Sequence, residues 1–396
     1  MNRLITAIIP PRQLAIGWLT LFLVGTELFV FSPLLPVLCN AYRLAPKLAG
    51  LSVTFFALAY MVSAPLFGHI SDRFGRRRVL IWCLLAFGAA NLFTAAASNL
   101  SSLLVARSLA GAVAGGISPT IYALVSGAAP PERRASWLAI TVSGLLAALA
   151  VGASLGSLIG ANLGWSAVFV ALAASGMMLA WLNGLVWAEE ERPGAPHWSD
   201  DRLPAAHIAR RLLPMIVWST GLYGVYIYIG TGLHEIGFSG AQVARAISVY
   251  GCGAIAGTLV GGRICDRLGA KRTAGASLAG LCICFWMLVL ALRSSAFVEL
   301  TLGVSSAVAQ FFFPAQQTSL ANDFPTRRST VLAWNNSALF LGISLGSLIG
   351  GQAISMGNFE TAVKICAGIV LTGCIINGIV VPDPRKERTA CTARPR

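Results

Sequence analysis

Long apolar stretches alternate with short polar ones along the whole chain. Each apolar stretch is close to the roughly 20 residues that an α-helix needs to cross the hydrocarbon core of a bilayer. The pattern therefore predicts an all-α membrane protein with twelve transmembrane helices. We place the spans at 13–36, 48–69, 79–98, 102–126, 137–161, 165–187, 212–233, 242–262, 273–292, 297–320, 330–354 and 361–381.

The composition supports this interpretation. The chain is 56% hydrophobic and only 11% charged, whereas a soluble domain carries about 25% charged residues. The net charge of +14 therefore does not indicate nucleic-acid binding. All but six of the 29 Lys and Arg residues lie in the termini and in alternate predicted loops. Because positive loops stay on the cytoplasmic side, we expect both termini inside, in the plasma membrane of a bacterium.

One polar stretch near the middle divides the spans into two sets of six. It predicts an N-terminal half at 1–188, a cytoplasmic linker at 189–211, a C-terminal half at 212–384 and a cytoplasmic tail at 385–396.

Three features of the first half recur in the same order in the second. "GHISDRFGRRR" begins at Gly68 and "GRICDRLGAKR" at Gly262, an offset of 194 residues. "PERRAS" before the fifth span matches "PTRRST" before the eleventh, and "SLGSLIG" stands in both of these spans. The chain is therefore interpreted as two parallel repeats, a transporter plan that places the substrate between the repeats near the midplane.

The loop "GHISDRFGRRR" resembles the signature loop between the second and third helices of the major facilitator superfamily. With its weaker second copy and twelve spans, the resemblance covers almost the whole chain. It implies the major facilitator fold, and it implies that the two loops act as a conformational latch between the halves. The latch residues implied are Gly68, Asp72, Arg73, Gly75, Arg76, Asp266 and Arg267.

Within that superfamily the chain resembles the drug:proton antiporter and sugar-efflux branch, which includes arabinose efflux permeases. The resemblance rests on "PLLPVL" in the first span and on "LLVARSLAG" in the fourth, which is similar to a motif linked to proton coupling. "GASLGS" in the fifth span departs from the antiporter motif, because Ala153 and Ser157 stand where that motif has proline and glycine.

Charge inside a predicted span is costly and usually functional. Arg245 and Lys364 lie near the outer ends of their spans, where snorkelling explains them, but two other charged residues stand out. Glu27 is near the middle of the first span and Arg107 is in the fourth. With a rise of 1.5 Å per residue, their depths differ by about 6 Å, so they are able to pair. A helix movement that changed the burial of Glu27 or its distance from Arg107 would load or release a proton. Substrate contact and a purely structural ion pair are the alternatives.

Residues four apart share one face of a helix, and three spans carry three glycines at this spacing. Such a bare face lets another backbone come very close. In the superfamily the fifth, eighth and eleventh helices meet across the boundary, so we predict that these glycines pack between the halves. They are Gly152, Gly156, Gly160, Gly253, Gly257, Gly261, Gly342, Gly346 and Gly350.

In the superfamily the first, fourth, seventh and tenth helices line the central cavity. On these spans the polar and aromatic candidates for a substrate cavity are Phe31, Ser118, Tyr122, Tyr223, Tyr226, Gln310 and Phe313. Aromatic rings and amides with few charges suit an amphipathic or weakly polar solute. Tyr228 is interpreted as an interfacial anchor.

The sequence thus predicts a secondary transporter that exports a drug or a sugar-like metabolite, by proton antiport through alternating access. Its partners are a small-molecule substrate, protons and the lipid bilayer; no cofactor or nucleic acid is expected, and we expect a monomer. An uptake symporter is the alternative within transport. A membrane enzyme is disfavoured because the four histidines form no ligand motif and no nucleophile or nucleotide-binding motif is present. A channel would not need two repeats with a latch loop in each.

Overall fold

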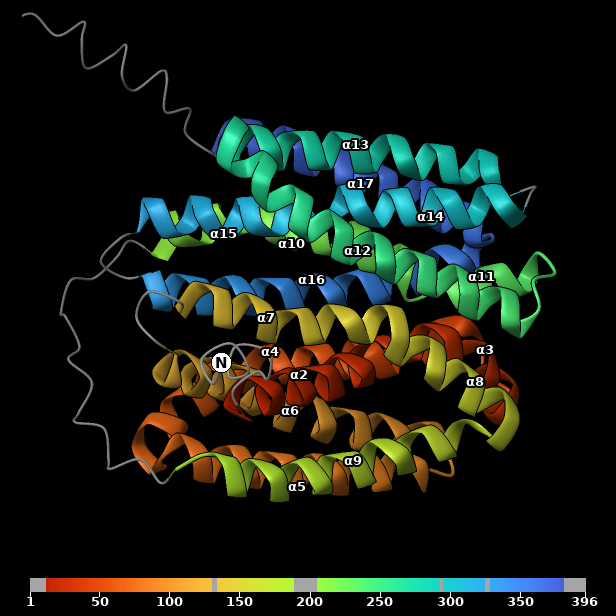
Figure 1. The fold of residues 1–396 in the computed structure, drawn as a ribbon. Helices are drawn as coiled ribbons and strands as arrows, with labels where there is room; N and C mark the ends of the chain where they lie inside the picture. Colours follow the sequence, from red (N-terminus) through yellow and green to blue (C-terminus); the bar gives the residue numbers. More distant parts are fainter. Residues whose placement is uncertain (1–11, 130–133, 189–204, 293–294, 325–327, 381–396) are drawn as a thin grey trace, which may run out of the picture.

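A computed structural model describes residues 12–129, 134–188, 205–292, 295–324 and 328–380. The described chain is all helical, and the helices lie side by side in one bundle (Figure 1). In order they are α2 (Arg12–Phe29), α3 (Phe31–Tyr42), α4 (Pro46–Phe74), α5 (Arg76–Ala95), α6 (Leu100–Ala128), α7 (Arg134–Ala147), η2 (Ala148–Gly152), α8 (Ala153–Leu163), α9 (Trp165–Val186), α10 (Ala205–Tyr226), α11 (Ile229–Glu235), α12 (Gly240–Leu268), α13 (Ala270–Ala291), α14 (Ser295–Ala309), α15 (Phe312–Asp323), α16 (Arg328–Met356) and α17 (Phe359–Val380).

Among the described residues, eleven helical stretches are long and apolar enough to cross a membrane, and the bent pair α2 and α3 makes a twelfth. The predicted fold class is therefore confirmed. The helices of residues 12–186 fill one side of the bundle and those of 205–380 the other (Figure 1), and they meet where α4 packs on α16 and where α7, η2 and α8 pack on α12. Residues 205–211, which we predicted as linker, belong to α10. The rest of that linker and the tail lie outside the described residues.

Two ends of the bundle are distinguished by their turns. At one end, here called the linker end, α4 turns into α5 at Gly75 and α12 turns into α13 at Gly269. These two glycines have φ of 93° and 84°, a region that glycine enters without a steric penalty. They are equivalent positions of the two repeated motifs. The opposite end, here called the distal end, carries Arg43 and Gly164, where φ is also positive.

Three predicted spans are broken near their middle. The first bends by 43° between α2 and α3, the seventh between Tyr226 and Ile229, and the tenth between Ala309 and Phe312. Proline explains two of these breaks, because it has no N–H to donate to the carbonyl four residues earlier. Pro33 leaves the carbonyl of Phe29 without a helical partner, and Pro314 does the same for Gln310. The predicted end of the first span was too early, since α3 continues to Tyr42.

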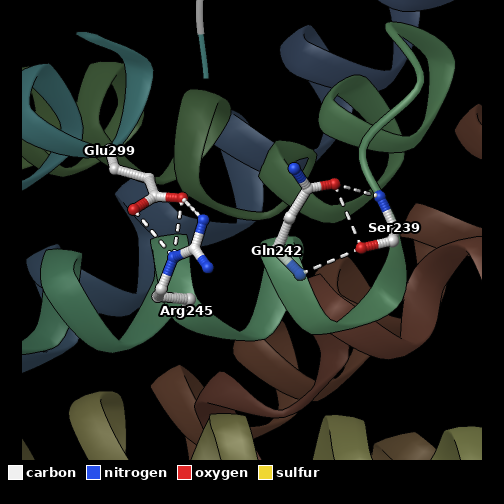
Figure 2. Close-up of polar contacts among 4 residues, drawn as sticks. All are labelled: Ser239, Gln242, Arg245 and Glu299. Atoms are coloured by element: carbon white, nitrogen blue, oxygen red, sulfur yellow. Dashed lines mark hydrogen bonds and ion pairs between the residues drawn. The ribbon is translucent and has the colours of Figure 1, made fainter. Parts of the chain in front are cut away.

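Figure 2 shows how α12 begins at the distal end. The Ser239 N–H donates to Gln242 Oε1 at 2.8 Å, and the Gln242 N–H donates to Ser239 Oγ at 3.4 Å, which is a reciprocal capping box. One turn further on, the Arg245 guanidinium holds both carboxylate oxygens of Glu299 on α14 at 2.7–3.0 Å. We interpreted Arg245 from sequence as snorkelling alone; the structure adds this ion pair, in which the arginine side chain is 59% exposed.

Candidate functional site

An ion pair between Glu27 and Arg107 lies inside the N-terminal half. Arg107 Nη1 on α6 donates to Glu27 Oε1 on α2, and the two residues are 1% and 0% exposed. The guanidinium is held between two aromatic rings, 4.2 Å from the centroid of Phe31 and 4.4 Å from that of Phe56. Cation–π contact of this kind strengthens when water is excluded. The structure thus brings together the two charged residues that the sequence marked.

The second carboxylate oxygen of Glu27, Oε2, has different surroundings from Oε1. Oε2 is buried and has no hydrogen-bond partner among the described residues. The neutral amide of Asn91 on α5 faces the carboxylate, and its Nδ2 donates to Phe87 O at 3.0 Å. A buried carboxylate oxygen without a donor is costly as an anion. The two carboxylate oxygens of Glu27 thus have unequal surroundings, since only Oε1 accepts from Arg107.

A second cluster, here called the Tyr60 group, joins the two halves near mid-depth. The rings of Tyr60 on α4 and Phe340 on α16 stack with centroids 3.6 Å apart and planes 14° apart. The Tyr60 hydroxyl faces the side chains of Ser118 on α6 and Asn336 on α16, and Tyr122 lies one turn from Ser118 on the same helix. Ser118 Oγ is buried without a hydrogen-bond partner among the described residues.

A third cluster, here called the Tyr226 group, consists of four aromatic residues. Phe29 of α2 stacks on Tyr223 at 6.5 Å and meets Tyr226 edge-on at 5.7 Å. Tyr226 in turn contacts Tyr250 of α12 at 5.2 Å. Both predicted tyrosines of α10 thus lie at the boundary between the halves. The Tyr60 and Tyr226 groups contain hydroxyls, one amide and apolar rings, but no charged side chain.

Among the described residues, most hydrogen bonds between the halves lie in the distal half of the bundle, and one, from Ser337 Oγ to Met61 O at 3.4 Å, lies near mid-depth. Ser347 Oγ donates to Gly50 O at 2.7 Å near the distal ends of α16 and α4. On the other side of the bundle, Ser248 Oγ of α12 donates to Ala150 O in the π-helical turn η2 at 3.1 Å, and it lies 2.6 Å from Ser154 Oγ. The halves are therefore closed against each other from the distal end to the level of Tyr60.

The prediction that the nine spaced glycines pack between the halves is wrong in this structure. A Cβ at Gly152, Gly156 or Gly160 would meet side chains of the first span. Those of α12 face α14 and its continuation within their own half, and those of α16 face α10 and its continuation within theirs. Spacing defines a bare helix face but not its direction. Other glycines make the close approaches between halves: Gly50, Gly230, Gly251 and Gly351.

The remaining predicted cavity residues and the predicted interfacial anchor lie in different parts of the bundle. Phe31 packs on Arg107 and Phe169 inside the N-terminal half, away from the Tyr60 and Tyr226 groups. Tyr228 is fully buried and donates to Ser347 O at 2.8 Å, so it is not an interfacial anchor. Gln310 is buried at the break between α14 and α15, and Phe313 is half-buried as the second residue of α15.

The predicted latch residues lie where α4 meets α5 and where α12 meets α13. Arg73 and Arg267 are exposed, Arg76 begins α5, and Gly68 has open space where a Cβ would stand. The side chains of Asp72 and Asp266 are outside the described part of the structure. Next to these residues, Arg77 Nη2 donates to Gly184 O of α9 at 2.6 Å within the N-terminal half.

Two cavities lie away from these clusters. One, of about 520 Å³, is an apolar groove between α4, α5 and α6 lined by residues such as Phe67, Phe74 and Trp82. The other, of about 600 Å³, lies at the distal end of the C-terminal half beside Glu235 and Glu360. Among the described residues, no group of three or more His, Cys, Asp or Glu side chains is placed to hold a metal ion.

Comparison with known proteins agrees with this architecture. The model of the Major Facilitator Superfamily matches residues 17–234 and 215–396, so the chain belongs to that superfamily of membrane transporters. It is 28% identical over 377 residues to the uncharacterized MFS-type transporter YtbD of Bacillus subtilis, covering 92% of this chain and 94% of the relative. It is 26% identical over 395 residues to the inner membrane transport protein YdhP of Escherichia coli K12, covering 97% and 98%.

A further relative is named for its substrate, and a solved transporter structure has a similar fold. The chain is 31% identical over 238 residues to the 3-(3-hydroxy-phenyl)propionate transporter of Escherichia coli K12, covering 58% of this chain and 59% of the relative. The crystal structure of a D-xylose-proton symporter matches with a TM-score of 0.79 at 16% identity, covering 94% of this chain and 98% of that one. These findings favour a transporter over the membrane enzyme considered from sequence.

Sequence reasoning missed Tyr60, Phe340, Tyr250 and Asn91. It searched only the first, fourth, seventh and tenth spans for cavity residues, whereas these four lie on α4, α16, α12 and α5. A polar or aromatic residue near the middle of an apolar span was the available signal. Tyr60 and Asn91 both satisfy it.

Proposed function

We propose that the chain is a secondary transporter that exports a small amphipathic or weakly polar solute, a drug or a sugar-like metabolite, in exchange for protons. Glu27 is the proton-carrying residue, and Arg107 stabilises its charged form. The substrate binds between the halves at the Tyr60 and Tyr226 groups. The observation that carries the proposal is the buried Glu27–Arg107 pair with one carboxylate oxygen left without a donor.

The energetics support a single proton site. One elementary charge moving down 100 mV is worth ~2.3 kcal/mol, which sustains roughly a 50-fold substrate gradient. A charged carboxylate is stable here only while Arg107 is paired with it, because an isolated buried charge is costly. Rearrangement of α2 relative to α6 would therefore change proton occupancy. This is the linkage that alternating access requires.

The chemistry of the two groups supports the substrate class. They offer tyrosine hydroxyls, one amide and flat apolar rings. Such surfaces suit a solute that has a ring and a few hydrogen-bonding groups but needs no countercharge. The protein acts as a monomer in the inner membrane of a bacterium, with the linker end in the cytoplasm and the two signature loops latching the halves there.

The test compares cells that express the wild-type protein, Glu27→Gln or Glu299→Gln. Glu299 is a matched control because its carboxylate also pairs with an arginine, at the exposed distal end. Each strain is loaded with ethidium, chloramphenicol or radiolabelled arabinose, and the intracellular content is measured with and without a protonophore. We expect the wild type and Glu299→Gln to lower the content of at least one compound in a protonophore-sensitive way, and Glu27→Gln to fail. Equal export by all three proteins would remove Glu27 from the mechanism.

A second candidate is proton-coupled uptake. One relative is called a transporter of 3-(3-hydroxy-phenyl)propionate, a name that is compatible with either direction of transport. The same cells distinguish the two functions. Uptake raises the content of the labelled compound, whereas export lowers it.

A further inference from the structure

We propose that Tyr226 couples the proton site to the closure of the distal side, by clamping the broken first span to the other half. This inference rests on the proposed function. The clamp consists of Phe29, Ser32 and Tyr226. The Tyr226 hydroxyl donates to Phe29 O at 2.9 Å, and Ser32 Oγ donates to Tyr226 O at 2.5 Å. Each half thus gives one donor to a backbone carbonyl of the other.

The acceptors of the clamp are available because both helices are interrupted there. The carbonyl of Phe29 would bond to the N–H of residue 33, but Pro33 has none. α10 ends at Tyr226. The Tyr228 N–H donates to Val225 O, three residues earlier instead of the four of an α-helix, so the regular helical hydrogen bonds stop here. A buried carbonyl without a donor is costly. The two orphaned carbonyls are therefore satisfied only while the halves are in contact at this point.

Gly230 lets the two backbones come close enough for the clamp. A Cβ on Gly230 would collide with the carbonyl oxygen of Ser32 and with the backbone of Pro33. All partners are deeply buried: Ser32 is 1% exposed, Phe29 3% and Tyr226 2%. Because the hydrogen bonds run between α2–α3 and α10, opening the distal side must break both of them.

Arg107 connects the clamp to the proton site. It pairs with Glu27 on α2, two residues before Phe29, and its guanidinium lies against the ring of Phe31 on α3. Arg107 therefore holds both limbs of the broken span, on either side of its 43° bend. When Glu27 gains a proton, the charge that anchors Arg107 to α2 is lost. The bend is then less constrained, and the positions of Phe29 O and Ser32 Oγ relative to Tyr226 change with it.

The surroundings of Glu27 leave Arg107 as the charge that acts on it. From α5 the facing group is the neutral amide of Asn91. Among the described residues, α7 and η2 approach α2 through Leu145 and Ala148 next to Gly25, and α9 does so through Asn183, which donates to Thr20 Oγ1 at 3.0 Å. Protonation of Glu27 therefore acts first on its ion pair with Arg107. The coupling also explains why an empty, deprotonated carrier would stay shut at the distal side, which prevents proton leakage in an antiporter.

The test measures the distal distance between the halves in the full chain. Spin labels are placed at Leu163 and Met356, which end α8 and α16 at the distal side and are both 73% exposed, in a background whose nine cysteines are replaced. The variants are Tyr226→Phe and Ser32→Ala, and the control is Tyr42→Phe. Tyr42 is a matched control because its hydroxyl also donates to a backbone carbonyl, that of Ala97 at 2.6 Å, and both residues belong to the N-terminal half.

We expect Tyr226→Phe and Ser32→Ala each to raise the distal-open population about tenfold at pH 7.5, equivalent to ~1.4 kcal/mol, while Tyr42→Phe leaves it unchanged. Glu27→Gln should open the distal side as well, and adding it to Tyr226→Phe should bring no further opening, since both act on one element. The proposal is overturned if Tyr226→Phe behaves like Tyr42→Phe, or if the effects of Glu27→Gln and Tyr226→Phe add. These distances require no transport, so failure of proton-coupled export would be seen separately, in the cell assay.

Discussion

The ring of Tyr60 stacks on that of Phe340 across the boundary between the halves, with centroids 3.6 Å apart. Both residues lie near the middle of their helices, and the Tyr60 hydroxyl faces Ser118 and Asn336. The stack closes the site in this structure. A solute that enters between the halves must separate these rings, and it then meets a hydroxyl, an amide and two aromatic faces.

Replacing Tyr60 with Phe should weaken substrate binding without affecting folding. The variant keeps the ring but removes the hydroxyl, and a hydrogen bond of this kind is worth about 0.5–1.5 kcal/mol. We expect KM for transport to rise about two- to tenfold, with kcat and the thermal unfolding midpoint close to wild type. Tyr42→Phe is the matched control, because its hydroxyl donates to Ala97 O at the distal end. An unchanged KM in Tyr60→Phe would place substrate elsewhere.

Breaking the Glu27–Arg107 pair on one side should cost far more than removing both charges. Arg107→Gln leaves a buried carboxylate without its partner, a change that typically destabilises by about 3–5 kcal/mol. The double variant Glu27→Gln/Arg107→Gln should recover most of that loss, as measured by thermal unfolding in detergent. A double variant no more stable than Arg107→Gln would contradict the pairing.

The ion pair in Figure 2 should contribute little to stability. The side chains of Arg245 and Glu299 are 59% and 15% exposed, and pairs that solvent reaches are usually worth about 0–1 kcal/mol. We expect Arg245→Gln to shift the unfolding midpoint only slightly, in contrast to Arg107→Gln. If Arg245→Gln lowered the unfolding midpoint as much as Arg107→Gln does, burial would not explain how much each ion pair contributes to stability.

The spaced glycines of α12 should govern stability within the C-terminal half. A methyl group on Gly253 would collide with the backbone of Gly303, and overpacking of this kind costs about 1–3 kcal/mol. Gly253→Ala should therefore lower the unfolding midpoint, whereas Gly262→Ala, which has open space at that position, should not. If Gly253→Ala were as stable as Gly262→Ala, the close contact between α12 and α14 would be in doubt.

Hydropathy and the repeated motifs predicted the twelve spans and the two equivalent loops that contain Gly75 and Gly269, because both depend on local sequence. Helical rise alone placed Glu27 and Arg107 at similar depth, so an ion pair between them could be predicted as possible. The directions of the glycine faces were not predictable, since the spacing on a helix does not fix its rotation within the bundle. The stack of Tyr60 on Phe340 depends on two residues from different halves. The clamp at Tyr226 depends on the break at Pro33 and on contacts between the halves, which sequence spacing does not fix.

The most direct test of the account uses purified protein in liposomes that contain the pH-sensitive dye pyranine. A compound that the wild type exports in cells is applied on one side, and proton movement is recorded for the wild type and for Glu27→Gln. The account predicts substrate-dependent proton movement in the direction opposite to the substrate for the wild type, and none for Glu27→Gln. Proton movement in the same direction as the substrate, or equal movement in both proteins, would contradict it.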